Sequence, residues 1–165
     1  MGQFATGITI ISTPTPAGPH HMTANGFMSV SLEPALVVVS IARRARMHDL
    51  LVESGVYGVG VLAADQEPLS THFSGRPDPN LLPRFDDHAG VPLVAGALAQ
   101  VAAEIVDTHA AGDHTLFVGE VRHLAVAAGE PLVFHAGRYR HLLRPAAEPE
   151  YSDAWSGFCL DPFGA

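Results

Sequence analysis

The sequence contains no lysine and only one cysteine, Cys159. One cysteine cannot form an internal disulfide, so the small disulfide-stabilised secreted domains are excluded, and a reducing cytoplasm is the expected location. The longest apolar runs are far shorter than the about 20 residues of a membrane-spanning helix. No cationic segment followed by an apolar stretch opens the chain, so we expect neither a membrane span nor a secretory signal.

Positive charge is also scarce, since Lys+Arg number 9 against 17 for Asp+Glu, and the formal net charge is -8. Proteins that bind nucleic acid or anionic membranes need a basic surface, so we expect neither partner. The ten histidines show no spacing typical of a metal site. His20 and His21 are adjacent and would point to opposite faces of a strand, while His109 and His114 lack a paired helical spacing. We therefore predict no bound metal.

The rest of the composition is that of a globular domain, with 165 residues, 47% hydrophobic and 16% charged. Residues 22–31 alternate imperfectly between apolar and polar, which is typical of a strand with one packed face. Glu33-Pro34 interrupts this pattern, because proline cannot donate to a strand ladder. Residues 36–41 (LVVVSI) are apolar except for Ser40, and this run predicts a strand buried on both faces. Arg43, Arg44 and Arg46 follow at once and would suit an anion.

Many short strands and two short helices predict a mostly β fold, an antiparallel barrel of one domain. The first helix should end at Gly55, a typical C-cap, and the second should begin at Asp65, a typical N-cap. The predicted domain covers residues 1–143, and a C-terminal extension follows at 144–165. This extension is expected either to be disordered or to pack on a partner, with Trp155 and Phe158 as the candidate anchors. The expected strands are 4–12, 22–31, 36–41, 56–62, 98–108, 114–123, 132–135 and 138–143. The expected helices are 47–54 and 65–73. Residues 74–83 are expected to form a loop, and residues 84–92 are expected to be irregular.

Four segments resemble the flavin reductase-like proteins with an FMN-binding split barrel. Residues 4–11 (FATGITII) are similar to the opening strand of that family, and residues 22–34 (MTANGFMSVSLEP) to its flavin-binding strand. Residues 112–114 (GDH), followed by Gly119, are similar to a hairpin motif, and residues 131–139 (PLVFHAGRY) to the closing strands. The four segments occur in the family's order and span residues 4–143.

This resemblance implies a six-stranded antiparallel Greek-key split barrel, usually a homodimer. It implies an enzyme that transfers hydride from NADH or NADPH to FMN or FAD. The reduced flavin would then pass to a separate flavin-dependent oxygenase, so that the chain is the reductase component of a two-component flavin monooxygenase.

The resemblance also implies site residues. The expected contacts to the flavin ring and ribityl chain are Thr23, Ala24, Asn25, Ser29, Val30 and Ser31, whose polar groups suit the edge of an isoalloxazine. The segment expected beneath the flavin and at its phosphate contains Ser40, Ile41, Ala42, Arg43, Arg46, Met47 and His48. Met47 stands where relatives often have Ser or Thr, so His48 or an arginine would have to compensate for a missing hydroxyl. Phe73 is expected near the distal end of the cofactor. His114 is expected beside the nicotinamide as the catalytic residue, with Tyr139 near the same place.

Several alternatives stay open at this point. A split barrel could retain its flavin as a carrier, sensor or biosynthetic protein without reductase turnover. The choice between FMN and FAD is open. NADPH would need a cation for its second phosphate, and four arginines could supply one: Arg76, Arg84, Arg138 and Arg140.

Overall fold

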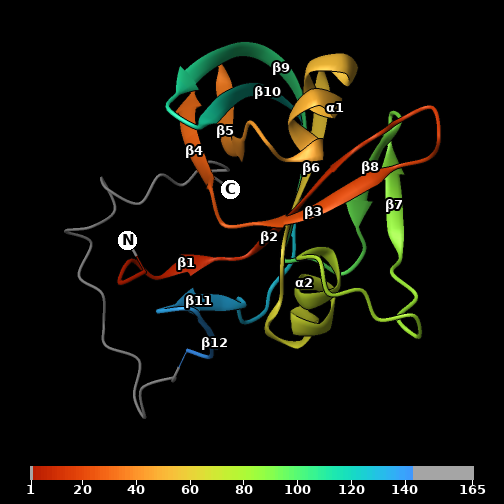
Figure 1. The fold of residues 1–165 in the computed structure, drawn as a ribbon, viewed down its shortest axis with the longest axis vertical. Helices are drawn as coiled ribbons and strands as arrows, with labels where there is room; N and C mark the ends of the chain where they lie inside the picture. The colour runs from red at the N-terminus through yellow and green to blue at the C-terminus, as the bar shows by residue number, and fades with distance from the viewer. Residues whose placement is uncertain (1, 143–165) are drawn as a thin grey trace.

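The structure is a computed structural model that describes residues 2–142. The expected C-terminal extension and Cys159 lie outside the described residues. Figure 1 shows the arrangement of the elements. They are β1 (Thr6–Gly7), β2 (Thr9–Thr13), β3 (His20–Ala24), β4 (Phe27–Leu32), β5 (Ala35–Ala42), α1 (Arg46–Ser54), β6 (Val56–Val61), a 3-10 turn (Ala64–Gln66), α2 (Glu67–Phe73), β7 (Phe85–His88), β8 (Val91–Val94), β9 (Ala99–Ala111), β10 (His114–Val126), β11 (Val133–His135) and β12 (Arg138–Arg140).

The largest sheet has the strand order β3-β2-β6-β9-β10-β5-β4, and all of its pairs are antiparallel. Its two edge strands, β3 and β4, are consecutive in the chain and are joined only through Asn25 and Gly26. The sheet therefore closes on itself, with β3 and β4 as the two halves of one bent strand. Counted in that way the barrel has six strands, and the predicted fold class is confirmed.

Two smaller sheets lie beside the barrel. β1, β11 and β12 form a three-stranded sheet in the order β1-β11-β12, and β7 pairs with β8. In Figure 1, α1 lies in the upper part beside β9 and β10, whereas α2 lies in the lower part with β11 and β12. No helix in the described part of the chain is long and apolar enough to cross a membrane.

The barrel interior follows from the apolar pattern. Val37, Val38 and Val39 are all buried, as expected for the largely apolar run in residues 36–41. Met47 and Leu51, one helical turn apart on α1, are fully buried in the same core. α1 ends as predicted, because Gly55 has a φ of 70° and its N–H donates to the Leu51 carbonyl at 3.0 Å.

Some local predictions are wrong. Residues 84–92, expected to be irregular, contain β7 and lead into β8, a hairpin that packs Val91 and Leu93 against Ala102 of β9. That packing is long-range, and two aspartates and a proline hide the strand pattern. Asp65 does not cap α2, because a 3-10 turn precedes the helix and the Gln66 side chain accepts the Ala63 N–H at 3.0 Å.

Three predicted strands are shorter or divided. The strand expected at 22–31 breaks at Asn25 and Gly26, where the chain changes its partner from β2 to β5. The opening strand begins at Thr6 and is interrupted at Ile8. The last strand, β12, is only three residues long.

Candidate functional site

The bend between β3 and β4 brings the predicted flavin strand against β5. The Ser40 N–H donates to the Gly26 carbonyl oxygen at 2.7 Å. A β-carbon on Gly26 would lie 3.1 Å from Ser40 Cβ and 3.2 Å from Ser40 O, so a larger residue would press the two segments apart. Asn25, beside this contact, is exposed. The fold therefore places side by side the two segments, the β3–β4 bend and β5, that the sequence analysis assigned to flavin binding.

The β9–β10 hairpin brings Asp113 and His114 beside the basic turn. His114 lies opposite Ala42 of β5, and the Arg43 N–H donates to the Asp113 carbonyl at 2.9 Å. The Asp113 carboxylate lies 2.7 Å from His114 Nδ1, and this hydrogen bond is the main reason why the pKa of Asp113 is lowered. Within residues 2–142, His114 Nε2 has no hydrogen-bond partner and is free for a ligand.

Three residues of the predicted phosphate segment are less available. Ile41 and Met47 are fully buried in the core, so they can offer a ligand only main-chain atoms. His48 has both ring nitrogens occupied, since Nε2 lies 3.0 Å from Thr115 Oγ1 and Nδ1 lies 2.9 Å from Asp49 Oδ1. Its ring is therefore fixed between α1 and β10, and its side chain would have to exchange a partner to hold phosphate.

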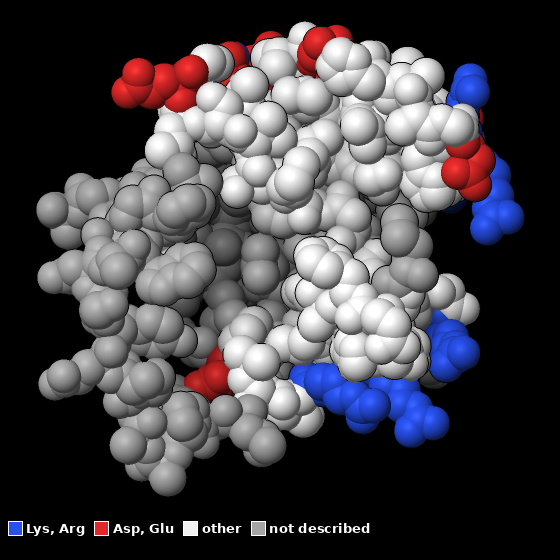
Figure 2. Space-filling model, turned by 90° about the vertical axis from the view of Figure 1, so that its left-hand side faces the viewer, with Lys and Arg blue, Asp and Glu red and all other residues white. Residues whose placement is uncertain are grey.

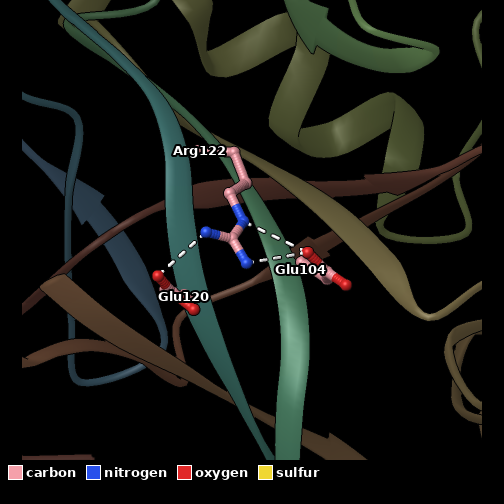
Figure 3. A network of polar contacts seen from close by, with 3 residues as sticks. All are labelled: Glu104, Glu120 and Arg122. Atoms are coloured by element: carbon pink, nitrogen blue, oxygen red, sulfur yellow. Dashed lines mark hydrogen bonds and ion pairs between the residues drawn. The ribbon is translucent and has the colours of Figure 1, made fainter. Parts of the chain in front are cut away.

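The arginines of this turn, in contrast, are accessible to a ligand. Arg43, Arg44 and Arg46 are exposed and form no ion pair with any residue in the described range. Arg122, on β10, is instead paired with two carboxylates: its guanidinium donates to Glu104 at 2.9 and 3.1 Å and to Glu120 at 2.8 Å (Figure 3). The basic turn is thus chemically suited to an anionic ligand group.

A second polar group lies where α2 meets β3. Thr23 Oγ1 donates to the Ser70 carbonyl at 2.6 Å, and Ser70 Oγ lies 2.8 Å from Tyr139 Oη. Tyr139 is therefore linked to the predicted flavin strand through α2. No contact joins Tyr139 to His114, and Figure 1 shows β12 in the lower part of the molecule and the β9–β10 hairpin in the upper part. The expectation that both lie near one place has no support from contacts in the described chain.

The β4 residues do not share one environment. Ser29 and Ser31 line a groove of about 450 Å³, whose other walls are mainly apolar residues of β5, β6, β9 and β10. Val30, at a bulge between them, does not line the groove and is 50% exposed. The structure therefore separates Val30 from its two serine neighbours.

Phe73 belongs to an aromatic cluster at the end of α2. Its ring lies 5.1 Å from His21 and 6.0 Å from Phe85, and His21 stacks on Phe85 at 3.9 Å. Burial, with a smaller contribution from His20, lowers the pKa of His21 to about 4, so this ring is neutral at physiological pH. His72 also contacts Phe73, with ring centroids 4.7 Å apart, so the cluster consists of two phenylalanines and two histidines.

Sequence reasoning missed Ser70 and Thr115. Ser70 is an isolated serine within α2 and Thr115 an isolated threonine within β10, and neither belongs to a recognisable motif. The sequence analysis singled out only their partners, which are Thr23 and Tyr139 for Ser70 and His48 for Thr115. Among residues 2–142, no group of three or more His, Cys, Asp or Glu side chains is arranged to hold a metal ion.

Comparisons with known proteins agree with one family. The family model described as flavin reductase like domain matches residues 1–143. An NADH-dependent flavin reductase from Rhodococcus sp. is 48% identical over 145 residues, which cover 86% of this chain and 82% of that protein. A 4-hydroxyphenylacetate 3-monooxygenase reductase component from Thermus thermophilus is 34% identical over 151 residues, which cover 88% of this chain and 95% of that protein.

A solved structure, flavin reductase PheA2 in its native state, has a TM-score of 0.84 at 43% identity, covering 87% of this chain and 94% of that one. The chain therefore belongs to the flavin reductase-like family, and the resemblance inferred from four sequence segments is confirmed. The roles of individual site residues stay predictions.

Proposed function

We propose that this protein is an NADH-dependent flavin reductase. The observation that carries the proposal is the strip of neighbouring residues at the bend of the barrel, where Gly26, next to the exposed Asn25, contacts Ser40, and where His114 lies opposite Ala42, in a chain whose relatives reduce flavins with NADH. The strip joins the predicted flavin strand to the predicted nicotinamide hairpin across one strand, β5. Adjacent flavin and nicotinamide sites are what direct hydride transfer needs.

The bound cofactors supply the redox chemistry: a hydride passes from nicotinamide C4 to flavin N5, and one solvent proton completes the reduced flavin. The residues of this chain bind and orient. The exposed Asn25 amide can both donate and accept, so it suits the polar edge of an isoalloxazine. Arg43, Arg44 and Arg46 supply unpaired positive charge for the flavin phosphate. His114 Nε2 is available to bind the nicotinamide amide, with its other nitrogen held by Asp113.

Anaerobic mixing of the purified protein with FMN or FAD, then with NADH or NADPH, tests the proposal. Rapid bleaching of the flavin absorbance with NADH is expected, and the faster flavin identifies the preferred acceptor. A flavin spectrum that shifts on binding but is not bleached by either nucleotide would contradict the reductase function. That result would favour a barrel that retains its flavin for another purpose.

The reduced flavin is expected to serve a second protein. The Thermus relative is the reductase component of a monooxygenase. We therefore propose a flavin-dependent oxygenase component as the acceptor of reduced flavin. A cytoplasmic location is proposed with it, because a chain with one cysteine is suited to a reducing compartment.

We also propose a homodimer whose interface includes the groove beside β4. Phe27, Leu36, Val121 and Leu124 line this groove, and Val126 at its margin is 66% exposed. In the view from the β4 side, most described surface is uncharged, with acidic residues and arginines at the rims (Figure 2). A groove lined mainly by apolar residues often marks an interface, and a second copy would cover it symmetrically.

Light scattering on a sizing column tests the dimer. Leu124→Asp is expected to yield monomers, whereas Val52→Asp, a change at an equally apolar but 66% exposed site on α1, should leave the mass unchanged. A wild-type protein that elutes as a monomer at all concentrations would overturn this part of the proposal.

A further inference from the structure

Each end of the short strand β7 carries a ring that stacks on a histidine of the barrel. Phe85, its first residue, lies on His21 of β3, with ring centroids 3.9 Å apart and planes 13° apart. His88, its last residue, lies on His123 of β10, with centroids 3.7 Å apart and planes 21° apart. β3 and β10 are not neighbours in the sheet, so the two stacks fix β7 at two separate places on the barrel.

The β7–β8 hairpin is held to the barrel by side chains. β7 and β8 form a sheet of their own, and within residues 2–142 no strand ladder joins them to the barrel. Val91 and Leu93 are buried against Ala102, and the Gln100 side chain donates to the Asp86 carboxylate at 2.9 Å. A strand that lacks ladder bonds to its support can separate from it without breaking the barrel.

Both barrel histidines have a buried ring nitrogen that no group in the described chain contacts. These atoms are His21 Nδ1 and His123 Nε2. A neutral imidazole can leave such a nitrogen without a proton, whereas an imidazolium carries a proton on both nitrogens. Protonation would therefore create a buried N–H with no acceptor, which is costly. Burial accordingly lowers the pKa of His21 to about 4 and also lowers the pKa of His123.

The groups around His21 do not stabilise a positive charge. His20, beside it on β3, contributes to the lowering of its pKa, and His20 in turn lies near Arg46 of α1. His72, on α2, contacts the other neighbouring ring, Phe73. In the described part of the chain no carboxylate forms an ion pair with His21.

The carboxylates near His123 already have partners. His123 and His88 line a cavity of about 330 Å³ together with Glu104 of β9 and Arg122 of β10. Glu104 is paired with Arg122 at 2.9 Å. Asp87, next to His88, accepts a main-chain N–H of the hairpin turn at 3.1 Å. A proton on His123 would thus add a positive charge against a second imidazole without gaining a free carboxylate.

We propose that the two histidine stacks form an acid-sensitive attachment: the β7–β8 hairpin stays docked while His21 and His123 are neutral, and it separates from the barrel as a local unit when they gain protons. Separation exposes the buried Val91 and Leu93 and removes Phe85 from its contact with Phe73 of α2, at 6.0 Å. The inference is independent of the proposed reductase function, because no step uses a flavin or a nucleotide.

The expected size of the effect follows from His21. Its ring binds a proton at a pKa of about 4 when stacked and at the ordinary 6.5 when exposed. Between about pH 7.5 and about pH 5, full exposure of this ring on opening raises the opening constant by about 30-fold. Partial exposure gives a smaller rise, and His123 adds to it in the same direction.

Hydrogen exchange followed by mass spectrometry tests the proposal at these two pH values, with exchange times scaled to the pH dependence of the chemical step. Peptides that cover residues 85–94 should lose protection by about 10- to 30-fold at the lower pH. Peptides from β5 and from residues 114–121 of β10 should lose less than about 3-fold. The proposal is overturned if hairpin and barrel lose protection equally, because acid would then unfold the protein as a whole.

The variants His21→Phe and His123→Phe keep a ring in each stack but cannot gain a proton there. Each should reduce the acid-induced loss of hairpin protection, and the double variant should reduce it to less than about 3-fold. His141→Phe is the matched control, since His141 is exposed and lies outside both stacks, and it should open as the wild type does. A double variant whose hairpin opens in acid as much as the wild type overturns the proposal. If a variant does not fold, the comparison of hairpin and barrel within the wild type still decides it.

Discussion

The Tyr57 hydroxyl occupies the space that a side chain at position 119 would need. A β-carbon on Gly119 would lie 2.5 Å from Tyr57 Oη and 2.8 Å from Ala103 Cβ. Tyr57 is fully buried, burial raises its pKa, and its hydroxyl donates to the Val37 carbonyl at 3.1 Å and lies 3.3 Å from the Phe117 carbonyl. The glycine that resembles a family motif therefore makes room for a tyrosine in the barrel core.

Gly119→Ala should lower the free energy of unfolding by about 2 to 4 kcal/mol, because the phenol must move and lose its partners. Urea denaturation measures this change. Tyr57→Phe should lower the free energy of unfolding less in the Gly119→Ala background than in the wild type, because it removes the oxygen that clashes with the added carbon. Gly7→Ala, where nothing lies within 4 Å of the added carbon, should change stability by less than about 0.5 kcal/mol. Equal losses for the two glycine variants would contradict the packing argument.

His114→Ala should slow flavin reduction about 10-fold, while the flavin Kd stays nearly unchanged, because its free nitrogen is assigned to the nicotinamide. Asn25→Ala should do the reverse and weaken flavin binding about 10-fold. Anaerobic stopped-flow absorbance gives the rate, and fluorescence quenching gives the Kd. His109→Ala, on the neighbouring strand and paired with Asp107, is the control. If the two effects were exchanged, the assignment of the two cofactors to the strip would be reversed.

Arg46→Gln should weaken FMN binding but not riboflavin binding, because riboflavin lacks the phosphate. A loss of about 5- to 10-fold is expected for one charged hydrogen bond at an exposed site. Arg122→Gln is the matched control, since that guanidinium is already held by Glu104 and Glu120. Parallel losses for FMN and riboflavin in Arg46→Gln would show that the basic turn does not hold phosphate.

The strongest sequence patterns predicted the barrel well. The buried run at residues 36–41, the α1 helix ending at Gly55 and the β9–β10 hairpin each have a local signature, either periodicity or turn chemistry. The β7–β8 hairpin has none, because its strands are short and depend on packing against β6 and β9. Local sequence cannot report such a dependence.

The candidate site shows the same difference between features that have a local sequence pattern and features that depend on long-range packing. The contact of Gly26 with Ser40 and the position of His114 opposite Ala42 both lie in segments that the sequence had marked. The burial of Met47 does not, because whether the second residue of a helix faces a ligand or the core depends on how the helix is docked. The links from Ser70 to Thr23 and Tyr139 join residues 47 and 69 positions apart, and no local pattern encodes them.

Acid should destabilise the protein through His21. Its pKa is about 4 in the folded chain and 6.5 ordinarily, so between these values the unfolded chain binds more protons and the free energy of unfolding rises with pH. Stability is therefore lost as pH falls through this window, and His123, whose pKa burial also lowers, acts in the same direction.

His21→Phe keeps the stack on Phe85 and removes a buried Nδ1 that has no hydrogen-bond partner among the described residues. Urea denaturation at about pH 7.5 and about pH 5 should show a smaller difference for this variant than for the wild type. The exposed His141→Phe should behave like the wild type, and an unchanged difference in His21→Phe would show that the acid sensitivity arises elsewhere.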